Sequence, residues 1–237
     1  MEQGSTKHKG TALVTGASSG IGLCVAKALR EKGFKVFGVG REFKGDLPFE
    51  TVTCDLLDTP SFEEKICKLI NNEDIHILVN CAGVGFYGLH ENIDAERIRI
   101  MTRTDLEIPM VLTSLVLPGM KRRKQGYIFN ISSVTSDEVN TYGAAYGALK
   151  AGLSSFSASI FEEGRKHGIK VVDICPDMTD TNLYRNADFG VAKEDPMSYL
   201  VPEDVAEVVT GILDMREGTS CTKVRIVPQH RRIGRGK

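Results

Sequence analysis

Apolar and polar residues follow two alternating patterns along this chain of 237 residues. Short apolar runs rich in β-branched residues are typical of buried strands, and longer amphipathic segments are typical of helices. The short runs predict seven strands, at residues 11–15, 35–39, 50–54, 75–80, 126–132, 170–175 and 223–227. The longer segments predict helices at residues 20–32, 61–71, 95–123, 144–167 and 202–216, and the last one opens with Pro202, where a missing N–H costs nothing.

Strands that alternate with helices predict βαβ units around a parallel sheet whose two faces are both covered. We therefore expect an α/β fold, a Rossmann-like doubly wound parallel seven-stranded sheet with helices on both faces, in a single domain over residues 1–237. Residues 182–202 lack a sustained period and mix polar, aromatic, Gly and Pro residues. We interpret this stretch as a loop or short helices that form a lid over a site.

Composition narrows the class of partner. Lys plus Arg total 30 and Asp plus Glu total 31, so no net field draws the protein to nucleic acid or to an anionic membrane. No stretch approaches the roughly 18 consecutive apolar residues of a membrane span, and the first ten residues are polar and basic. We expect a cytoplasmic protein with a small-molecule partner, and neither a nucleic-acid nor a membrane partner.

The cysteines and histidines show no metal-ligand spacing. Six cysteines lie far apart without a CxxC pair, which predicts reduced and mostly buried thiols, and five histidines form no cluster. We expect no metal site. The basic runs at residues 121–124 and 231–237 are interpreted as a solvated helix end and a frayed terminus.

A glycine-rich turn links the first predicted strand to the first helix. Its sequence, TGASSGIG from Thr15 to Gly22, lets a pyrophosphate approach the backbone and the helix N-terminus. A bare tight turn is the alternative, but a strand before and a helix after favour a dinucleotide site. The candidate contacts are Gly16, Ser18, Ser19, Gly20, Ile21 and Gly22.

The end of the second predicted strand bears on the kind of dinucleotide. An acidic residue is expected there when a free ribose 2′-hydroxyl is bound, but the chain has Gly40. Arg41 follows, and a guanidinium suits a 2′-phosphate, so NADP(H) is favoured over NAD(H). Glu42 keeps NAD(H) open, because it would point inward if the strand ended one or two residues later. The alternative for Arg41 is a solvated loop charge.

Tyr146 and Lys150 lie four residues apart on a predicted helix, so they share one face. A phenol is a poor base at neutral pH, but a nearby ammonium favours the phenolate, and the pair therefore indicates proton transfer. A surface Tyr and Lys pair is the alternative; the small residues at 143–148 favour the close approach of another molecule. Tyr142 lies at a different helical angle.

Ser132 and Ser133 close the fifth predicted strand, and ligands collect at the carboxyl ends of strands in such sheets. Either serine can donate a hydrogen bond to a substrate oxygen. Either can instead cap the chain after the strand, which is the commoner role for Ser in this setting.

Taken together, these motifs resemble the short-chain dehydrogenase/reductase family, in its compact single-domain branch. The similarity covers nearly the whole chain and rests on the TGxxxGIG turn, Asp55, the Asn80-Cys-Ala-Gly83 run, a serine and the YxxxK pair. In that family the catalytic serine lies thirteen positions before the tyrosine, which selects Ser133.

The resemblance implies a homodimer or homotetramer and assigns further contacts. Asp55 is expected at the adenine, Asn80 near the adenosine ribose, Lys150 at the nicotinamide ribose hydroxyls and Thr181 at the carboxamide. The remaining candidates for cofactor contact are Leu56, Ala82, Gly83, Pro176, Asp177, Met178 and Thr179.

The chain departs from the family pattern at two positions. Asp105 stands where the family has an Asn that anchors a water of the proton relay. Its carboxylate can still hold a water, or it can pair with Lys150 and weaken the effect of this lysine on Tyr146. Asp177 stands where the family commonly has Gly, near the carboxamide end of the nicotinamide.

We expect an NADP(H)-dependent interconversion of a ketone and a secondary alcohol, in which Ser133 binds the carbonyl oxygen, Tyr146 moves the proton and the nicotinamide moves the hydride. The alternative is a cofactor-binding regulatory or sensor protein with weak or lost catalysis, which Asp105 and Asp177 favour. Epimerisation or dehydration of a nucleotide sugar is weaker, since no sizeable substrate domain remains. Arg185 in the predicted lid either meets an anionic substrate group or ties the lid down.

Overall fold

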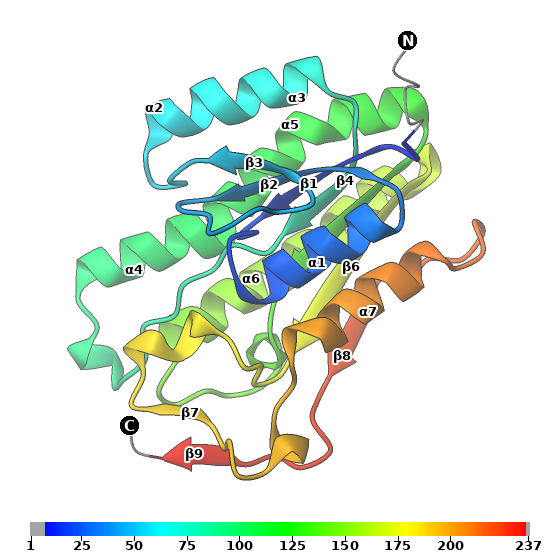
Figure 1. Ribbon diagram of the computed structural model, residues 1–237. Helices are drawn as coiled ribbons and strands as arrows, with labels where there is room; N and C mark the ends of the chain where they lie inside the picture. Colours follow the sequence, from blue (N-terminus) through cyan, green and yellow to red (C-terminus); the bar gives the residue numbers. More distant parts are fainter. Residues whose placement is uncertain (1–7, 236–237) are drawn as a thin grey trace.

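A seven-stranded parallel sheet forms the centre of the protein, which a computed structural model describes over residues 8–235; residues 1–7, part of the basic N-terminal segment, and residues 236–237 lie outside the described part (Figure 1). The strand order is β3-β2-β1-β4-β5-β6-β8, and the expected Rossmann-like sheet is confirmed. The strands are β1 Thr11–Thr15, β2 Lys35–Gly40, β3 Glu50–Thr53, β4 Ile75–Asn80, β5 Gly126–Ile131, β6 Ile169–Pro176 and β8 Lys223–Ile226.

Helices cover both faces of this sheet because both faces present apolar side chains. On one face, α1 (Gly20–Glu31) and α7 (Pro202–Leu213) pack on a core that includes Val14, Val79 and Ile174. On the other face lie α2 (Thr59–Phe62), a π-helical turn, α3 (Lys68–Asn72), α5 (Ile108–Arg123) and α6 (Ala144–Gly164), over a core that includes Leu13 and Leu78. Neighbouring residues in β1 thus face opposite layers, as strand geometry requires.

The strand order changes direction between β1 and β4. The chain leaves β1 towards β2 and β3 on one side, and continues from β4 to β5, β6 and β8 on the other. In open parallel sheets, a crevice forms outside the carboxyl ends of the strands at such a switch point, and ligands bind there. The topology therefore places a site next to Thr15 and Asn80, the last residues of these two strands.

The segment expected as one helix at residues 95–123 contains a π-helical turn. α4 (Ala95–Thr102) continues through this turn, Arg103–Glu107, into α5 without a break. Pro109 explains the wider turn, because proline lacks an N–H and its ring clashes with the carbonyl four residues earlier. That carbonyl belongs to Asp105, so the π-helical turn contains one of the two aspartates that depart from the family pattern.

A second, two-stranded sheet corrects two expectations. β7 (Phe189–Val191) pairs antiparallel with β9 (Ile233–Arg235), with Gly190 opposite Gly234, at the bottom of Figure 1. The stretch at 182–202 is therefore partly a strand, and the described part of the basic tail is paired rather than frayed. Backbone pairing between β7 and β9 stabilises both segments, and the local sequence of neither segment predicts this pairing.

Two smaller features complete the fold. All six cysteines are free, but only Cys54 and Cys175 are buried and the other four are half-buried, so the expectation of mostly buried thiols was wrong. Over residues 8–235, no helix combines the length and the apolar content needed to cross a membrane.

Candidate active site

The turn after β1 has the backbone of a phosphate cradle. Gly16 and Gly20 have φ angles of 68° and 54°, values that side chains rarely adopt. A Cβ on Gly22 would lie 2.3 Å from the Gly16 carbonyl oxygen, and one on Gly16 would lie 2.9 Å from the Cα of Ala82. The three glycines thus allow a tight turn against the neighbouring loop, with the N-terminus of α1 left open to an anion.

Thr15 holds that neighbouring loop in place. Its hydroxyl oxygen accepts hydrogen bonds from the backbone N–H groups of Cys81, at 3.0 Å, and Ala82, at 3.1 Å. The hydroxyl itself donates to the carbonyl of Val79 at 3.4 Å. The carboxyl ends of β1 and β4 are joined in this way, and together they form the floor of a groove.

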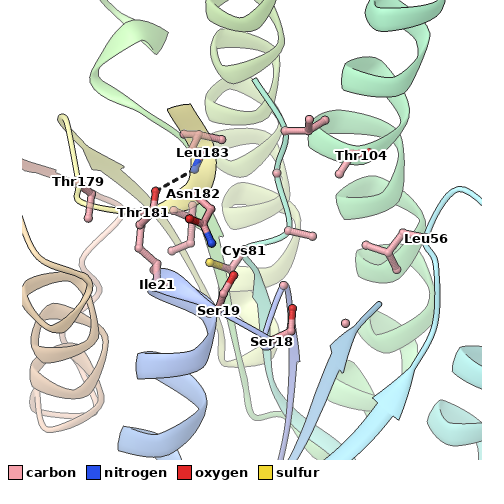
Figure 2. Close-up of a pocket in the computed structure, with 18 of the residues that line it drawn as sticks. Ser18, Ser19, Ile21, Leu56, Cys81, Thr104, Thr179, Thr181, Asn182 and Leu183 are labelled. Carbon is pink, nitrogen blue, oxygen red and sulfur yellow. Dashed lines mark hydrogen bonds between the residues drawn. The ribbon is translucent and has the colours of Figure 1, made fainter. Parts of the chain in front are cut away.

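This groove runs across the carboxyl edge of the sheet from Arg41 and Asp55 to Tyr146. Figure 2 shows Ser18, Ser19 and Ile21 at the start of α1, Leu56 and Thr104 across from them, and Thr181 to Leu183 over one end. Nineteen of the candidate residues line it: Gly16, Ser18, Ser19, Gly20, Ile21, Gly22, Gly40, Arg41, Asp55, Leu56, Ala82, Gly83, Ser133, Tyr146, Lys150, Pro176, Asp177, Thr179 and Thr181.

Three candidate residues lie outside the groove. Asn80 is 2% exposed, and its Nδ2 donates to Oδ1 of Asn130 at 2.7 Å, so its side chain supports the floor of the groove. Its expected place near the adenosine ribose stays a prediction. Met178 faces a second cavity, described below, and Asp105 is buried behind Gly83.

The end of β2 agrees with the sequence interpretation. β2 stops at Gly40, where a Cβ would lie 2.9 Å from the Cβ of Ser18, so a larger side chain is excluded without movement. Arg41 lines the groove and Glu42 does not. Arg41, and not Glu42, is therefore the charged residue that could meet the 2′ position of a bound adenosine ribose.

Tyr146 and Lys150 lie on one face of α6, as expected. The Lys150 Nζ lies 5.4 Å from the centroid of the Tyr146 ring, and both side chains are buried except where they meet the groove. Nζ donates to the carbonyl of Ile131 at 3.1 Å and lies 3.0 Å from Oδ1 of Asp105. The lysine therefore pairs directly with the carboxylate, one of the two arrangements that the sequence left open.

Asp105 is fixed from both sides. Its Oδ2 accepts a hydrogen bond from the backbone N–H of Val84 at 3.0 Å, while Oδ1 faces Lys150. Burial raises the pKa of the Asp105 carboxyl above its ordinary value, whereas Lys150 and the Val84 N–H favour its charged form. The side chain is fully buried, so this ion pair is shielded from salt.

The phenol of Tyr146 is hard to ionise in this setting. Burial raises its pKa well above the ordinary value, and the negative charge of Asp105 acts in the same direction. Hydrogen bonding to Ser133 and Tyr87 acts to lower the pKa. The protonated phenol is therefore the resting form.

The two serines after β5 have different surroundings. The Ser132 hydroxyl lies 3.3 Å from the carbonyl of Ile174 and 3.2 Å from the sulfur of Cys175, and is occupied by these partners. Ser133 lines both cavities and also caps a short turn by accepting from the backbone N–H of Thr135 at 3.2 Å. Ser133 is thus the serine placed beside Tyr146 and open to a ligand.

A second cavity of about 800 Å³, here called the cleft, joins the groove. The two share Ser133, Tyr146, Asp177 and Tyr184 as common wall. The predicted lid at residues 182–202 contains Asp188 and Phe189 of the cleft, whereas Tyr87, Glu138 and Arg231 were not among the candidate site residues. The sequence signal for the cleft is the presence of aromatic residues in predicted loops, at positions 87, 184 and 189.

Asp177 lines the groove and also holds the C-terminal segment. Its Oδ2 accepts from Nε of Arg231 at 2.8 Å, and its Oδ1 accepts from the N–H of Met178 at 2.8 Å. Arg231 also contacts Glu138, with Nη2 2.7 Å from Oε2. Both carboxylate oxygens of Asp177 therefore have partners, and its expected place near the carboxamide stays a prediction. Arg185 donates to the carbonyl of Asn182 at 2.9 Å, which supports its role in tying down the local turn.

No group of three His, Cys, Asp or Glu side chains within residues 8–235 is arranged to hold a metal ion. The groove, in contrast, has the features of a dinucleotide site: a glycine cradle, a helix N-terminus and a Lys at its inner end. A family model described as short chain dehydrogenase matches residues 10–189. The chain belongs to this family. As a member of the short-chain dehydrogenase/reductase family, it is an NAD(P)-dependent enzyme.

Relatives extend this result over nearly the whole chain. An uncharacterized oxidoreductase of Staphylococcus saprophyticus is 30% identical over 231 residues, which cover 92% of this chain and 96% of the relative. An NADP-dependent 3-hydroxy acid dehydrogenase of Salmonella typhi is 30% identical over 233 residues, covering 91% and 94%. Among solved structures, the closed form of a serine dehydrogenase complexed with NADP+ has a TM-score of 0.82 at 28% identity, covering 92% and 94%.

Proposed function

We propose that this enzyme interconverts a ketone and a secondary alcohol with NADP(H), and that Tyr146 is its general acid and base. The observation that carries the proposal is the junction of the groove and the cleft at Ser133 and Tyr146. A cofactor in the groove and a substrate in the cleft would meet at this common wall, where the hydroxyl groups of Ser133 and Tyr146 lie beside Lys150.

Each residue at the junction has a separate task. The Ser133 hydroxyl donates a hydrogen bond to the carbonyl oxygen and orients it. Tyr146 donates its phenolic proton to the same oxygen during reduction and accepts it back during oxidation. Lys150, whose Nζ lies 5.4 Å from the centroid of the Tyr146 ring, stabilises the phenolate that forms. When bound, the reduced nicotinamide supplies the hydride for the carbonyl carbon.

The groove supplies positions for each part of the cofactor. The turn from Gly16 to Gly22 would hold the pyrophosphate, Asp55 and Leu56 would hold the adenine, and Lys150 would hold the nicotinamide ribose. Pro176, Asp177, Thr179 and Thr181 line the groove and would hold the nicotinamide end, while Met178 lines the cleft. The proposed homodimer or homotetramer comes from the family resemblance, and gel filtration with light scattering would test it.

Preference for NADP(H) rests on Arg41 together with Gly40. A carboxylate at position 40 would bind a free 2′-hydroxyl, but Ser18 occupies the space that its Cβ needs. Arg41 lines the groove and offers a planar cation to a 2′-phosphate. The relative of Salmonella typhi and the serine dehydrogenase structure, both described with NADP, support the same preference.

The test is a panel of ketones and alcohols with each cofactor, followed by the absorbance of the reduced nicotinamide. Tyr146→Phe should lower kcat by about 10²–10⁴ while the Kd for NADPH changes little, because the phenyl ring keeps its packing and loses the proton. Tyr127→Phe is the matched control, since Tyr127 lies on β5 outside both cavities. A Tyr146→Phe enzyme with full turnover would refute the assignment.

A cofactor-binding regulator is the second candidate, and the Asp105–Lys150 ion pair favours it. The charge of Lys150 is balanced by the Asp105 carboxylate 3.0 Å away, so Lys150 does less to stabilise the Tyr146 phenolate. Catalysis would then be slow while cofactor binding stays intact. Tight NADPH binding with no oxidation by any carbonyl of the panel, and no gain of turnover in Asp105→Asn, would support this function.

A further inference from the structure

The cleft has aromatic walls next to the reacting groups. Tyr87 lies with its ring centroid 5.5 Å from that of Tyr146, 6.0 Å from Tyr184 and 5.1 Å from Phe189. Tyr184 and Phe189 are themselves 5.7 Å apart. Tyr87 thus contacts the other three rings, and together they give an aromatic wall beside the place where a carbonyl would meet Tyr146. Such a wall offers ring faces and edges to a planar ring, which suits it better than a flexible chain.

The charges of the cleft are acidic. Among its lining residues in the part of the chain that the structure describes, Glu138, Asp177 and Asp188 carry carboxylates and Arg231 alone is basic. Arg41 and Arg185 line the groove and not the cleft. An anion that enters the cleft therefore meets more negative than positive charge.

Arg231 is not available to bind an anionic substrate. Its Nε contacts Asp177 at 2.8 Å, while Nη2 and Nη1 contact Glu138 at 2.7 and 3.4 Å. Arg225 binds Glu138 as well, so this carboxylate is held by two arginines, and hydrogen bonding to Arg231 and Arg225 lowers its pKa. A substrate carboxylate would have to displace existing ion pairs on both sides of the guanidinium before it could use this cation.

From these observations we infer that the cleft selects an uncharged carbonyl or alcohol with an aromatic or alicyclic ring and rejects substrates that carry a carboxylate or another anionic group near the reacting carbon. This inference rests on the proposed function, since it names the substrate class of the same site. It separates the enzyme from the relative of Salmonella typhi, whose described substrate, a 3-hydroxy acid, carries a carboxylate.

Three ketones that share one skeleton separate the effect of a negative charge on kcat/KM from the effect of added bulk. Propiophenone is the neutral ring ketone, 4-propanoylbenzoate adds a carboxylate, and methyl 4-propanoylbenzoate has the added bulk without the charge. We expect kcat/KM with NADPH for the ester to lie within about threefold of propiophenone, and for the carboxylate to fall at least about tenfold below the ester. The Kd values of the three ligands for the NADP+-loaded protein should follow the same order.

Variants connect the selectivity to the named residues. In Glu138→Gln with Asp177→Asn, Arg231 loses both carboxylates, so the ratio of ester to carboxylate should narrow by at least about tenfold. Glu163→Gln is the control, because Glu163 lies on α6 outside both cavities and its loss should leave the ratio unchanged. An unchanged ratio in the double variant that folds and binds NADPH would overturn the role assigned to Arg231.

Failure of the inference and failure of the proposed function give different results. If none of the ketones is turned over with either cofactor, the proposed function fails, and the order of Kd values still decides the inference. If 4-propanoylbenzoate is reduced or bound as well as its methyl ester, the inference is overturned while the oxidoreductase stands. Absence of measurable binding by both neutral ketones overturns it as well.

Discussion

Replacing Asp105 by Asn should move the pH dependence of alcohol oxidation to lower pH. In this direction Tyr146 must lose its proton, so the rate rises with pH through the ionisation of this phenol. The negative charge of Asp105 is one of the causes that raise the pKa of Tyr146. An amide at this position removes the charge but keeps an oxygen for the Val84 N–H, and Lys150 retains its bond to the Ile131 carbonyl.

The distances set the size of the effect. Oδ1 of Asp105 lies 3.0 Å from Nζ of Lys150, and Nζ lies 5.4 Å from the Tyr146 ring centroid, so the carboxylate oxygen is within about 8 Å of the ring. With an effective dielectric constant of about 20, a unit charge at that distance opposes formation of the phenolate by about 2 kcal/mol. This corresponds to about 1.5 pH units, and local relaxation leaves an expected shift of about one.

The assay is the pH profile of kcat for oxidation of a secondary alcohol with NADP+, from pH 5 to about 10. Glu107→Gln serves as control, because it removes an exposed carboxylate from the same π-helical turn and should leave the profile in place. A profile of Asp105→Asn that coincides with that of the unmodified enzyme, or moves to higher pH, would show that the ion pair does not govern the phenol.

Further predictions concern the cofactor, the aromatic wall and the tail. Arg41→Ala should raise the Kd for NADPH at least about tenfold and the Kd for NADH little, measured by nicotinamide fluorescence; equal losses would remove the 2′-phosphate assignment. Gly85→Ala should raise KM for ring ketones with little change in NADPH binding, because its Cβ would lie 2.4 Å from the Tyr87 ring; unchanged KM would contradict this. Hydrogen bonding to Arg231 and Arg225 lowers the pKa of Glu138. The stability that these ion pairs contribute is therefore fully present at a pH above the ordinary pKa of a glutamate, and it is lost as the pH falls through the lowered pKa. Hydrogen exchange in β9 should accelerate on that acidification, and exchange independent of pH beyond its intrinsic dependence would refute the link.

The sequence predicted the features that depend on local patterns. All seven strands of the main sheet follow from short apolar runs, and the cradle from Gly16 to Gly22 follows from a turn that only glycine permits. Tyr146 and Lys150 share a helix face because the period of a helix brings residues four apart together. In each case the information lies within a few residues of the feature itself.

Features that depend on distant contacts were missed or left open. β7 and β9 are three residues each and gain their order from pairing across more than forty positions. Arg231 meets Glu138 and Asp177, which are 93 and 54 residues away, so its ion pairs are invisible in a linear pattern. Asn80 and Asn130 are hydrogen-bonded because they lie next to each other in the parallel strands β4 and β5, a register that the linear sequence does not give.

Pairing between β7 and β9 connects the wall of the cleft to the C-terminal segment, which lies beyond the residues 10–189 matched by the family model. The residues that the family model matches contain the cradle, Tyr146 and Lys150, whereas Arg231 and β9 lie outside them. Substitutions in this short segment are therefore expected to change the cleft through Arg231, while the cradle and the pair of Tyr146 and Lys150 stay as they are.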